Sequence, residues 1–323
     1  MFFKAPLSVL LDVNSSCQLR CKYCSAMPFD GTDVPIERTV ALLQELGKLQ
    51  VWYLSFSGGE PFLHPGIMTF IETASRVGIA PTVNTNGLKL LEDTVLSQLV
   101  HLKANGVKYL LSISLDSPDP VANNASRGRG KEAAEGIRRA IAAGLNVRIS
   151  SVVHAENVNT ALDIPEVFKG AKNYSFFPMY STWSSQQRGE KLIADKKIMQ
   201  DFWQRASELQ QRYGENLITL PFRKHDRPDE VSFVKKNNHG TCFCAFSKCF
   251  IDSHLNVYPC DMTRTASLCL GNLMSTTFQS VWNGQAAHRI REMAKEERLC
   301  KRAPVLNSSG DLPVRYSEKE VAL

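Results

Sequence analysis

Three cysteines stand close together just after the first apolar segment of the chain. Residues 13–27 read VNSSCQLRCKYCSAM, which places Cys17, Cys21 and Cys24 in a C-x3-C-x2-C arrangement. Side chains at this spacing can meet at one centre only if the chain curls around it. Thiolates are soft ligands that suit zinc or an iron–sulfur cluster. The segment is therefore a candidate metal site.

This segment contains no fourth candidate ligand. A structural zinc site usually has four protein ligands, and the next cysteine, Cys242, follows only after more than two hundred residues. Three interpretations remain open. The fourth ligand comes from a distant part of the chain, the thiols are free, or one metal of a cluster is left open for a substrate or cofactor.

The remaining composition restricts the class of protein. The 323 residues are 43% hydrophobic and 22% charged, as in globular proteins, and suffice for a barrel with a smaller appendage. No apolar run is long enough to span a membrane, and the N-terminus lacks a signal-peptide cleavage site. Nine cysteines without an export signal indicate metal or redox chemistry. The net charge of +6 comes from scattered, mixed charges, which disfavours a nucleic-acid partner. We predict a cytoplasmic protein with no membrane partner.

Strand and helix patterns alternate as far as residue 214, which predicts a parallel sheet with right-handed crossovers. The predicted strands are residues 7–13, 51–56, 79–84, 109–115, 145–153 and 174–178. The predicted helices are residues 35–49, 65–77, 92–104, 131–143, 162–168 and 195–213. A polar stretch then suggests a linker, and a cysteine-rich segment follows with a predicted hairpin and a helix over 277–295. The expected domains are residues 1–220, a linker at 221–240, and residues 241–323.

The cysteine spacing, with the aromatic Tyr23 before the third cysteine, resembles the signature of radical S-adenosylmethionine (radical SAM) enzymes. In that family the three cysteines hold a [4Fe-4S] cluster, and S-adenosylmethionine (SAM) chelates its open iron. The resemblance implies that Cys17, Cys21 and Cys24 are metal ligands and that the main chain of Tyr23 lies near the adenine. It also implies an α/β fold, a partial (β/α)6 TIM-like barrel with the cofactor at the carboxyl ends of the strands. Other βα barrels follow the same rule.

Two turns after predicted strands resemble SAM-binding motifs of this family. Gly58, Gly59 and Glu60 form a GGE turn, which taken alone is a tight turn that glycine permits. The resemblance assigns these three residues to the amino group of SAM. Asn86 lies in a TNG turn, which by itself is a common turn sequence, and the resemblance places it in the cofactor pocket.

The fourth strand ends in the letters SISLD. Strand alternation puts Ser112, Ser114 and Asp116 on one face, which predicts a polar face inside the barrel. The segment resembles the SLD motif of the SPASM-type radical SAM group, which assigns Ser114 to the ribose of SAM. Asp116 is either structural or in contact with substrate. Arg127, at nearly the family's spacing, would pair with the SAM carboxylate; the alternative is a surface arginine.

The C-terminal cysteines resemble the SPASM domain or its shorter form, the twitch domain. The VYPC, LGN and WN pieces match, but the terminal C-x2-C and the dense middle cysteine series are absent. We therefore expect one auxiliary iron–sulfur cluster. Its predicted ligands are Cys244, Cys260 and Cys300, with Cys242, Cys249 or Cys269 as a possible fourth, and zinc is the competing metal. Cys249 or Cys269 could alternatively be catalytic and return a hydrogen atom to substrate, although a spare cysteine is usually a small buried hydrophobe.

The resemblance implies an enzyme that cleaves SAM to a 5′-deoxyadenosyl radical and removes a hydrogen atom from a substrate C–H bond. Such enzymes receive an electron from a donor such as flavodoxin or ferredoxin. The expected substrate is a ribosomally made peptide or another natural product. The first strand begins by about residue 7, leaving no leader-recognition domain before it, and this favours a dehydrogenase or epimerase of a sugar or aminocyclitol. The rivals are a non-catalytic iron–sulfur or zinc scaffold and an RNA-modifying enzyme.

Overall fold

A single ten-stranded sheet forms the framework of the computed structural model, which describes residues 4–179, 192, 194–220 and 244–296. The strand order is β10-β9-β8-β1-β2-β3-β4-β5-β6-β7. Neighbouring strands from β1 to β7 are parallel, and β8 is parallel to β1, whereas β9 and β10 are antiparallel to their neighbours. The bounds are β1 Ser8–Asn14, β2 Tyr53–Gly58, β3 Thr82–Thr85, β4 Leu110–Ser114, β5 Val147–Val153, β6 Asn173–Pro178, β7 Ile218–Thr219, β8 Lys248–Ile251, β9 Asn256–Tyr258 and β10 Gly271–Asn272.

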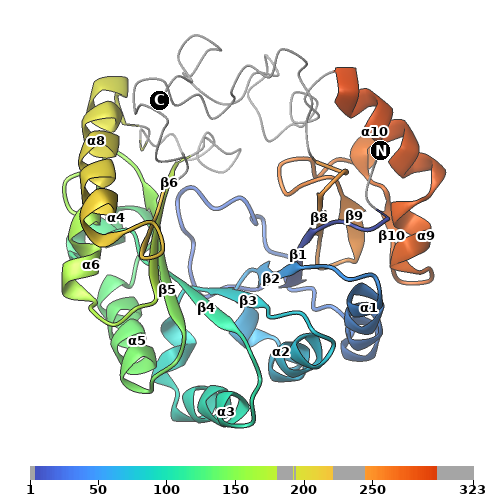
Figure 1. Cartoon of the computed structure of the whole chain (residues 1–323), viewed down its shortest axis with the longest axis horizontal. Coiled ribbons are helices and arrows are strands. Elements are labelled where there is room, and N and C mark those ends of the chain that lie inside the picture. The colour runs from blue at the N-terminus through green and yellow to red at the C-terminus, as the bar shows by residue number, and fades with distance from the viewer. Residues whose placement is uncertain (1–3, 180–191, 193, 221–243, 297–323) are drawn as a thin grey trace.

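Helices cover the outer side of the curved sheet (Figure 1). They are α1 Ile36–Lys48, α2 Ile67–Arg76, α3 Asp93–Ala104, α4 Pro120–Ser126, α5 Gly130–Ala142, α6 Ile164–Val167, α8 Lys196–Tyr213, α9 Phe278–Trp282 and α10 Gln285–Glu296. The predicted partial (β/α)6 barrel is confirmed. Sequence patterns missed α4 and β7 and joined α9 to α10, although Gly284 lies between the two helices. In the part of the chain that the structure describes, no helix is both long and apolar enough to cross a membrane.

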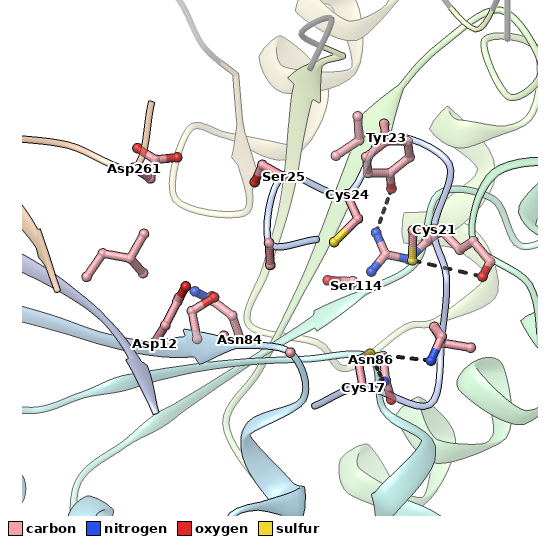
Figure 2. A pocket seen from close by; sticks show the side chains of 18 of the residues that line it. Asp12, Cys17, Cys21, Tyr23, Cys24, Ser25, Asn84, Asn86, Ser114 and Asp261 are labelled. Atoms are coloured by element: carbon pink, nitrogen blue, oxygen red, sulfur yellow. Dashed lines mark hydrogen bonds between the residues drawn. The ribbon is translucent and has the colours of Figure 1, made fainter. Parts of the chain in front are cut away.

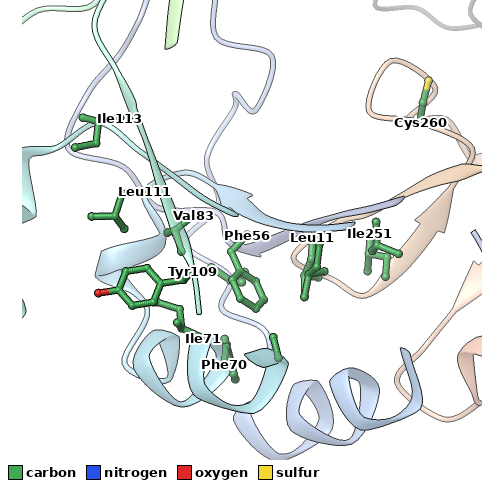
Figure 3. Close-up of a cluster of buried hydrophobic side chains, with 14 of the residues drawn as sticks. Leu11, Phe56, Phe70, Ile71, Val83, Tyr109, Leu111, Ile113, Ile251 and Cys260 are labelled. Carbon is green, nitrogen blue, oxygen red and sulfur yellow. The ribbon is translucent and has the colours of Figure 1, made fainter. Parts of the chain in front are cut away.

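Alternation along the strands separates an apolar outer face from a polar inner face. Leu11, Phe56 and Val83 point outward and pack with Phe70 and Ile71 of α2 (Figure 3). In each strand the side chains that alternate with these apolar ones face the inside of the barrel, and many of them are polar. Burial of the apolar face provides most of the driving force for folding, so the inner face is free to carry chemistry.

The cysteine-rich C-terminal segment extends the sheet of the barrel. Its predicted hairpin is β8 and β9, and β8 pairs with β1 so that Val9 lies opposite Cys249 and Leu11 opposite Ile251. The sequence did not predict this pairing. The expected linker, residues 221–240, lies outside the described residues. Because β1 also leads into the cysteine loop, the two cysteine-rich segments are attached to the same strand.

Two side chains of α1 form hydrogen bonds with the backbone of the C-terminal segment. Glu45 accepts hydrogen bonds from the backbone N–H groups of Phe278 (3.0 Å) and Gln279 (2.8 Å). Arg38 donates to the carbonyl oxygens of Leu273 and Thr276. Glu45 therefore satisfies N–H groups that have no partner within the first turn of α9.

Replacing Glu45 by alanine is expected to destabilise the folded protein by about 1–2 kcal/mol, the usual cost of losing a helix cap. The measurement is denaturant unfolding of the reconstituted protein without oxygen. Gln44→Ala is the matched control, because Gln44 is an exposed neighbour on the same helix. Equal effects of the two substitutions would show that the Glu45 contact contributes nothing.

Candidate functional site

A cavity of about 440 Å³ opens at the carboxyl ends of the barrel strands. Figure 2 shows the cysteine loop and the strand ends around it. Most of the cofactor-binding residues predicted from sequence line this cavity: Cys17, Cys21, Tyr23, Cys24, Gly58, Gly59, Asn86, Ser114 and Arg127. The fold thus brings together residues that are up to 110 positions apart in the chain.

The thiols of the cysteine loop are held by hydrogen bonds. The sulfur of Cys17 accepts from the Leu19 N–H at 3.4 Å and from Asn86 Nδ2 at 3.7 Å, and Cys21 Sγ lies 3.9 Å from the Arg127 carbonyl oxygen. Burial raises the pKa of Cys17 and raises that of Cys21 to about 11. These thiols are therefore protonated at neutral pH in the absence of metal, and metal binding displaces their protons.

The donor set fits a cluster better than a single metal ion. Among the described residues, no three His, Cys, Asp or Glu side chains are close enough to bind one ion. A four-iron cluster binds each cysteine through a different iron, so its three sulfurs do not have to converge on one point. Three soft thiol ligands facing one cavity meet this requirement. The cysteine loop therefore fits an iron–sulfur cluster that keeps one iron open.

The paired glycines are required by the close approach of the cysteine loop. Gly58 has φ +121°, and a Cβ there would lie 2.3 Å from the Asn14 carbonyl oxygen. A Cβ on Gly59 would lie 2.0 Å from the Ser16 carbonyl oxygen. The gap is closed by hydrogen bonds from Gly59 N to Asn14 O (3.1 Å) and from Glu60 N to Ser16 O (2.7 Å). Any side chain at these glycines would push the cysteine loop out of position.

The carboxylate of Glu60, for which the resemblance predicts binding to the amino group of SAM, contacts two turns of the barrel. It is fully buried, is not part of the cavity wall, and accepts hydrogen bonds from Thr85 Oγ1 (2.7 Å), Asn86 N (2.8 Å) and Phe62 N (3.2 Å). Burial raises the pKa of its carboxyl group in spite of these donors. Of the GGE turn, the glycines face the cavity, while Glu60 ties the loop after β2 to the loop after β3. It therefore positions Asn86.

The polar inner face of β4 matches the prediction. Ser114 lines the cavity, and Ser112 Oγ lies 2.9 Å from Ser150 Oγ of β5. Asp116 is fully buried and does not line the cavity. Of its two predicted alternatives, contact with substrate and a structural role, the structure shows the structural one.

Asp116 connects the cysteine loop to the barrel. Its carboxylate accepts hydrogen bonds from Tyr23 Oη (2.5 Å) and Ser126 Oγ (2.8 Å), and Arg127 Nη1 lies 3.6 Å from it. Burial opposes ionisation, but the charge of Arg127 and the neighbouring His154 ring, whose Nε2 lies 3.6 Å away, outweigh it and lower the pKa of Asp116. Arg127 also donates to Tyr23 Oη at 2.6 Å. The tip of the cysteine loop is thus attached to a buried ion pair.

The opposite wall of the cavity contains charged residues that the sequence analysis did not assign. Asp12 comes from β1, and Asp261 and Arg264 come from the loop after β9. Arg264 Nη1 lies 3.5 Å from Asp12 Oδ2, and its guanidinium stacks 4.2 Å from the centre of the Phe250 ring. Burial raises the pKa of Asp12 to about 7, although Arg264 opposes this. The signal in the sequence was one acidic residue in the apolar run LLDV.

Two of the predicted auxiliary ligands lie together. The thiol of Cys244 hydrogen bonds to Cys260 and lowers the pKa of Cys260. Buried Arg291 of α10 fixes the neighbouring turn by donating to the Ala245 carbonyl oxygen at 2.7 Å. The predicted ligand Cys300 and the possible fourth ligand Cys242 lie outside the described residues.

The structure brings neither Cys249 nor Cys269 to the cavity. Cys249 is buried opposite Val9, whose face of the sheet packs against the helices, whereas Leu10 and Asp12 face the cavity. Burial raises the pKa of the Cys249 thiol. The sulfur of Cys269 lies 3.5 Å from the Gly271 carbonyl oxygen. These positions agree with the packing interpretation and give no support to hydrogen-atom donation.

Comparisons with family models identify two segments of the chain. The model described as the radical SAM superfamily matches residues 13–165. The model described as SPASM, an iron–sulfur cluster-binding domain, matches residues 242–302. The first match contains the cysteine loop and the ends of β2, β3, β4 and β5, and the second contains Cys244, Cys260 and Cys300.

Curated relatives cover most of the chain at low identity. The mycofactocin maturase MftC of Mycobacterium tuberculosis is 25% identical, over 89% of this chain and 73% of the relative. The AdoMet-dependent heme synthase of Nitratidesulfovibrio vulgaris is 24% identical, over 88% and 80%. The PqqA peptide cyclase of Xanthomonas axonopodis pv. citri is 24% identical, over 93% and 80%.

The fold also matches a solved structure. SuiB of Streptococcus suis, bound to S-adenosylmethionine, superposes with a TM-score of 0.73 at 17% identity. The match covers 89% of this chain and 68% of that one. At this identity the likeness shows a shared fold.

Gly59→Ala is expected to remove about four irons per chain, the content of one cluster, because its Cβ would collide with the Ser16 carbonyl oxygen. Iron and sulfide analysis after anaerobic reconstitution provides the measurement. Gly78→Ala is the control, since an added Cβ at Gly78 has nothing within 4 Å. Its positive φ of +91° adds a backbone strain that Gly59 lacks, so the control should keep its iron in spite of that strain. Full iron content in Gly59→Ala would contradict the steric argument.

Asp12→Asn is expected to gain stability relative to the parent as the pH rises. The unfolded carboxyl titrates near pH 4, whereas the folded one titrates at about 7. Between these values the folded protein keeps a proton that the unfolded chain has lost, so the parent loses stability with rising pH. The difference should grow by roughly 2–4 kcal/mol from pH 5 to pH 8, as measured by denaturant unfolding. A difference that is constant with pH would contradict a raised pKa for Asp12.

Proposed function

Because the chain belongs to the radical SAM superfamily and carries a SPASM domain, we propose that it modifies a ribosomally made peptide by removing a hydrogen atom from an unactivated C–H bond. The observation that carries this proposal is the composition of the cavity. Cys17, Cys21 and Cys24 face it together with Ser114 and Arg127. A cavity that keeps all these groups is suited to turnover, which a scaffold would not require.

The cluster and SAM, when bound, supply reductive cleavage of SAM to methionine and a 5′-deoxyadenosyl radical. The residues of the chain bind and orient the groups that react. The guanidinium of Arg127, which lines the cavity, is suited to the carboxylate of SAM, since arginine binds carboxylates bidentately. We assign Ser114 to the ribose, the main chain of Tyr23 to the adenine, and Gly58, Gly59 and Glu60 to the amino group.

The opposite wall is the proposed position of substrate. It combines the charges of Asp12, Asp261 and Arg264 with apolar side chains, among them Phe177 and Met179. Peptides carry polar amide groups together with charged and apolar side chains. A wall with charged and apolar side chains can bind each of these groups. The PqqA peptide cyclase is one relative named for a peptide. Since another relative is a heme synthase, a small-molecule substrate, including the sugar or aminocyclitol predicted above, is the alternative tested below.

The C-terminal segment would hold one auxiliary cluster. Cys244 and Cys260 are already in contact, and Cys300 falls within the matched SPASM segment. An auxiliary cluster near the substrate wall could accept the second electron of an oxidation. The first electron would come from a flavodoxin or ferredoxin. None of the seven cysteines that the structure describes forms a disulfide, as we expect of a protein in the reducing cytoplasm.

The test begins with the protein reconstituted under anaerobic conditions. With SAM and dithionite, the parent should contain about eight irons per chain and release 5′-deoxyadenosine. The variant with Cys17, Cys21 and Cys24 all changed to Ala should contain about four irons and release none. Cys249→Ala is the control, because Cys249 faces away from the cavity, and should behave as the parent does. Zinc in place of iron, or no nucleoside from fully loaded parent, would overturn the radical reaction.

The peptide substrate is tested separately. Short peptides encoded beside the gene of this protein are incubated with the active enzyme and examined by mass spectrometry in deuterated buffer. A loss of two hydrogens, or incorporation of one deuterium, in a peptide supports the proposal. Turnover of a sugar or aminocyclitol alone would replace peptide by the small-molecule alternative while leaving the radical chemistry intact.

A further inference from the structure

A second cavity opens at the other end of the barrel, where the strands begin. Its volume is about 940 Å³, larger than that of the site described above. Its wall carries four cationic side chains and no carboxylate: Lys103, Lys108, Arg148 and Lys172. Nothing in the proposed reaction uses this cavity. An excess of positive charge without acidic partners is unusual on a surface in which the two signs are otherwise mixed.

Arg148 is half-buried, whereas the three lysines of this group are exposed. It lies on β5, where its neighbours in register are Ser112 of β4 and Asn173 of β6. Strand alternation places it on the inner face, with Ser150 and Val152. Its Nε atom is buried and has no hydrogen-bond partner among the described residues. Burial lowers the pKa of its guanidinium. A buried donor without a partner is costly, and a shift of the Arg148 side chain toward an anion in the cavity would remove that cost.

The lysines leave positive charge available at the same cavity. Within the described part of the chain, the ammonium groups of Lys108 and Lys172 have no hydrogen bond or ion pair. Lys103 donates to the Gly144 carbonyl oxygen, a neutral acceptor that leaves its charge uncompensated. Each of these three lysines is exposed. They can therefore turn toward a ligand that is held more deeply by Arg148.

Hydroxyl groups from three adjacent strands complete the wall. Ser8 of β1, Ser55 of β2 and Thr82 of β3 all line the cavity. Deeper in the barrel, Ser112 and Ser150 hydrogen bond to each other and line neither cavity. The two cavities are thus separate sites at opposite ends of the same strands.

We propose that this cavity binds a phosphorylated small molecule, with the half-buried Arg148 as the anchor for a phosphate group. One carboxylate would balance one of the four positive charges, whereas a phosphate or diphosphate balances two or more. Arginine binds phosphate oxygens through two parallel hydrogen bonds, and the hydroxyl groups can donate further ones. The volume lies within the range of sites for ligands of nucleotide size. Tyr53, 65% exposed at the rim, offers a ring against which a base can stack.

The test is isothermal titration calorimetry of the reconstituted protein at constant ionic strength. The protein is saturated with SAM, so that the cavity at the carboxyl ends of the strands is filled. The titrants are inorganic phosphate, pyrophosphate, AMP and ADP. Saturable binding of one molecule per chain is expected, and Arg148→Gln should weaken it at least tenfold. Lys131→Gln is the control, because Lys131 is exposed on α5 and does not line the cavity; it should bind like the parent.

A second variant protects the test against misfolding. If Arg148→Gln loses iron or helical circular dichroism, the double variant Lys108→Gln and Lys172→Gln is used, since both side chains are exposed. Tighter binding of ADP than of phosphate would support a nucleotide, and equal binding would support free phosphate in the same anion site. No saturable binding at millimolar concentration, or equal affinity in parent, Arg148→Gln and the double variant, would overturn the proposal.

Discussion

The buried carboxylate of Asp116 fixes the cysteine loop to the barrel. Tyr23 of the loop donates to it at 2.5 Å, and Arg127 contacts both Tyr23 and Asp116. Because the carboxylate is buried, it must be compensated where it lies, and the compensating groups are those that shape the cavity. The same interaction that satisfies Asp116 also directs a positive charge to the place where we expect the carboxylate of SAM.

The base of the cysteine loop is held by a contact of a different kind. Gly58 and Gly59 let the β2 turn lie against the backbone of Asn14 and Ser16, and Glu60 connects that turn to Asn86. Loop tip and loop base are thus fixed by the protein itself. Metal binding has to deprotonate thiols whose pKa is raised by burial, and a loop already in position pays little further entropy when the metal binds.

Local patterns predicted most of the barrel, because its strands and helices repeat one simple unit. Ser114 could be predicted to face the cavity because its motif coincides with the end of β4, whereas the prediction for Arg127, at the end of α4, depended on its spacing from that motif. The contacts of Glu60 could not be predicted, because only the fold shows that its donors come from its own turn and from the turn after β3. The pairing of β8 with β1 was also hidden: a four-residue strand carries no information about which edge it joins. The ion pair between Asp12 and Arg264 depends on that strand pairing, so the sequence did not predict it either.

The pairing of β8 with β1 also explains why the wall of the cavity proposed for substrate is charged. Once β8 adds to β1, the loop after β9 reaches the carboxyl end of β1 and places Arg264 3.5 Å from Asp12. Without Arg264, burial beside Asp261 and Asp252 would raise the pKa of Asp12 further. The C-terminal segment therefore sets the charge of a residue on the first strand of the barrel. The ionisation of Asp12 therefore depends on the barrel and on the C-terminal segment together. The barrel alone would not reproduce this wall of the cavity.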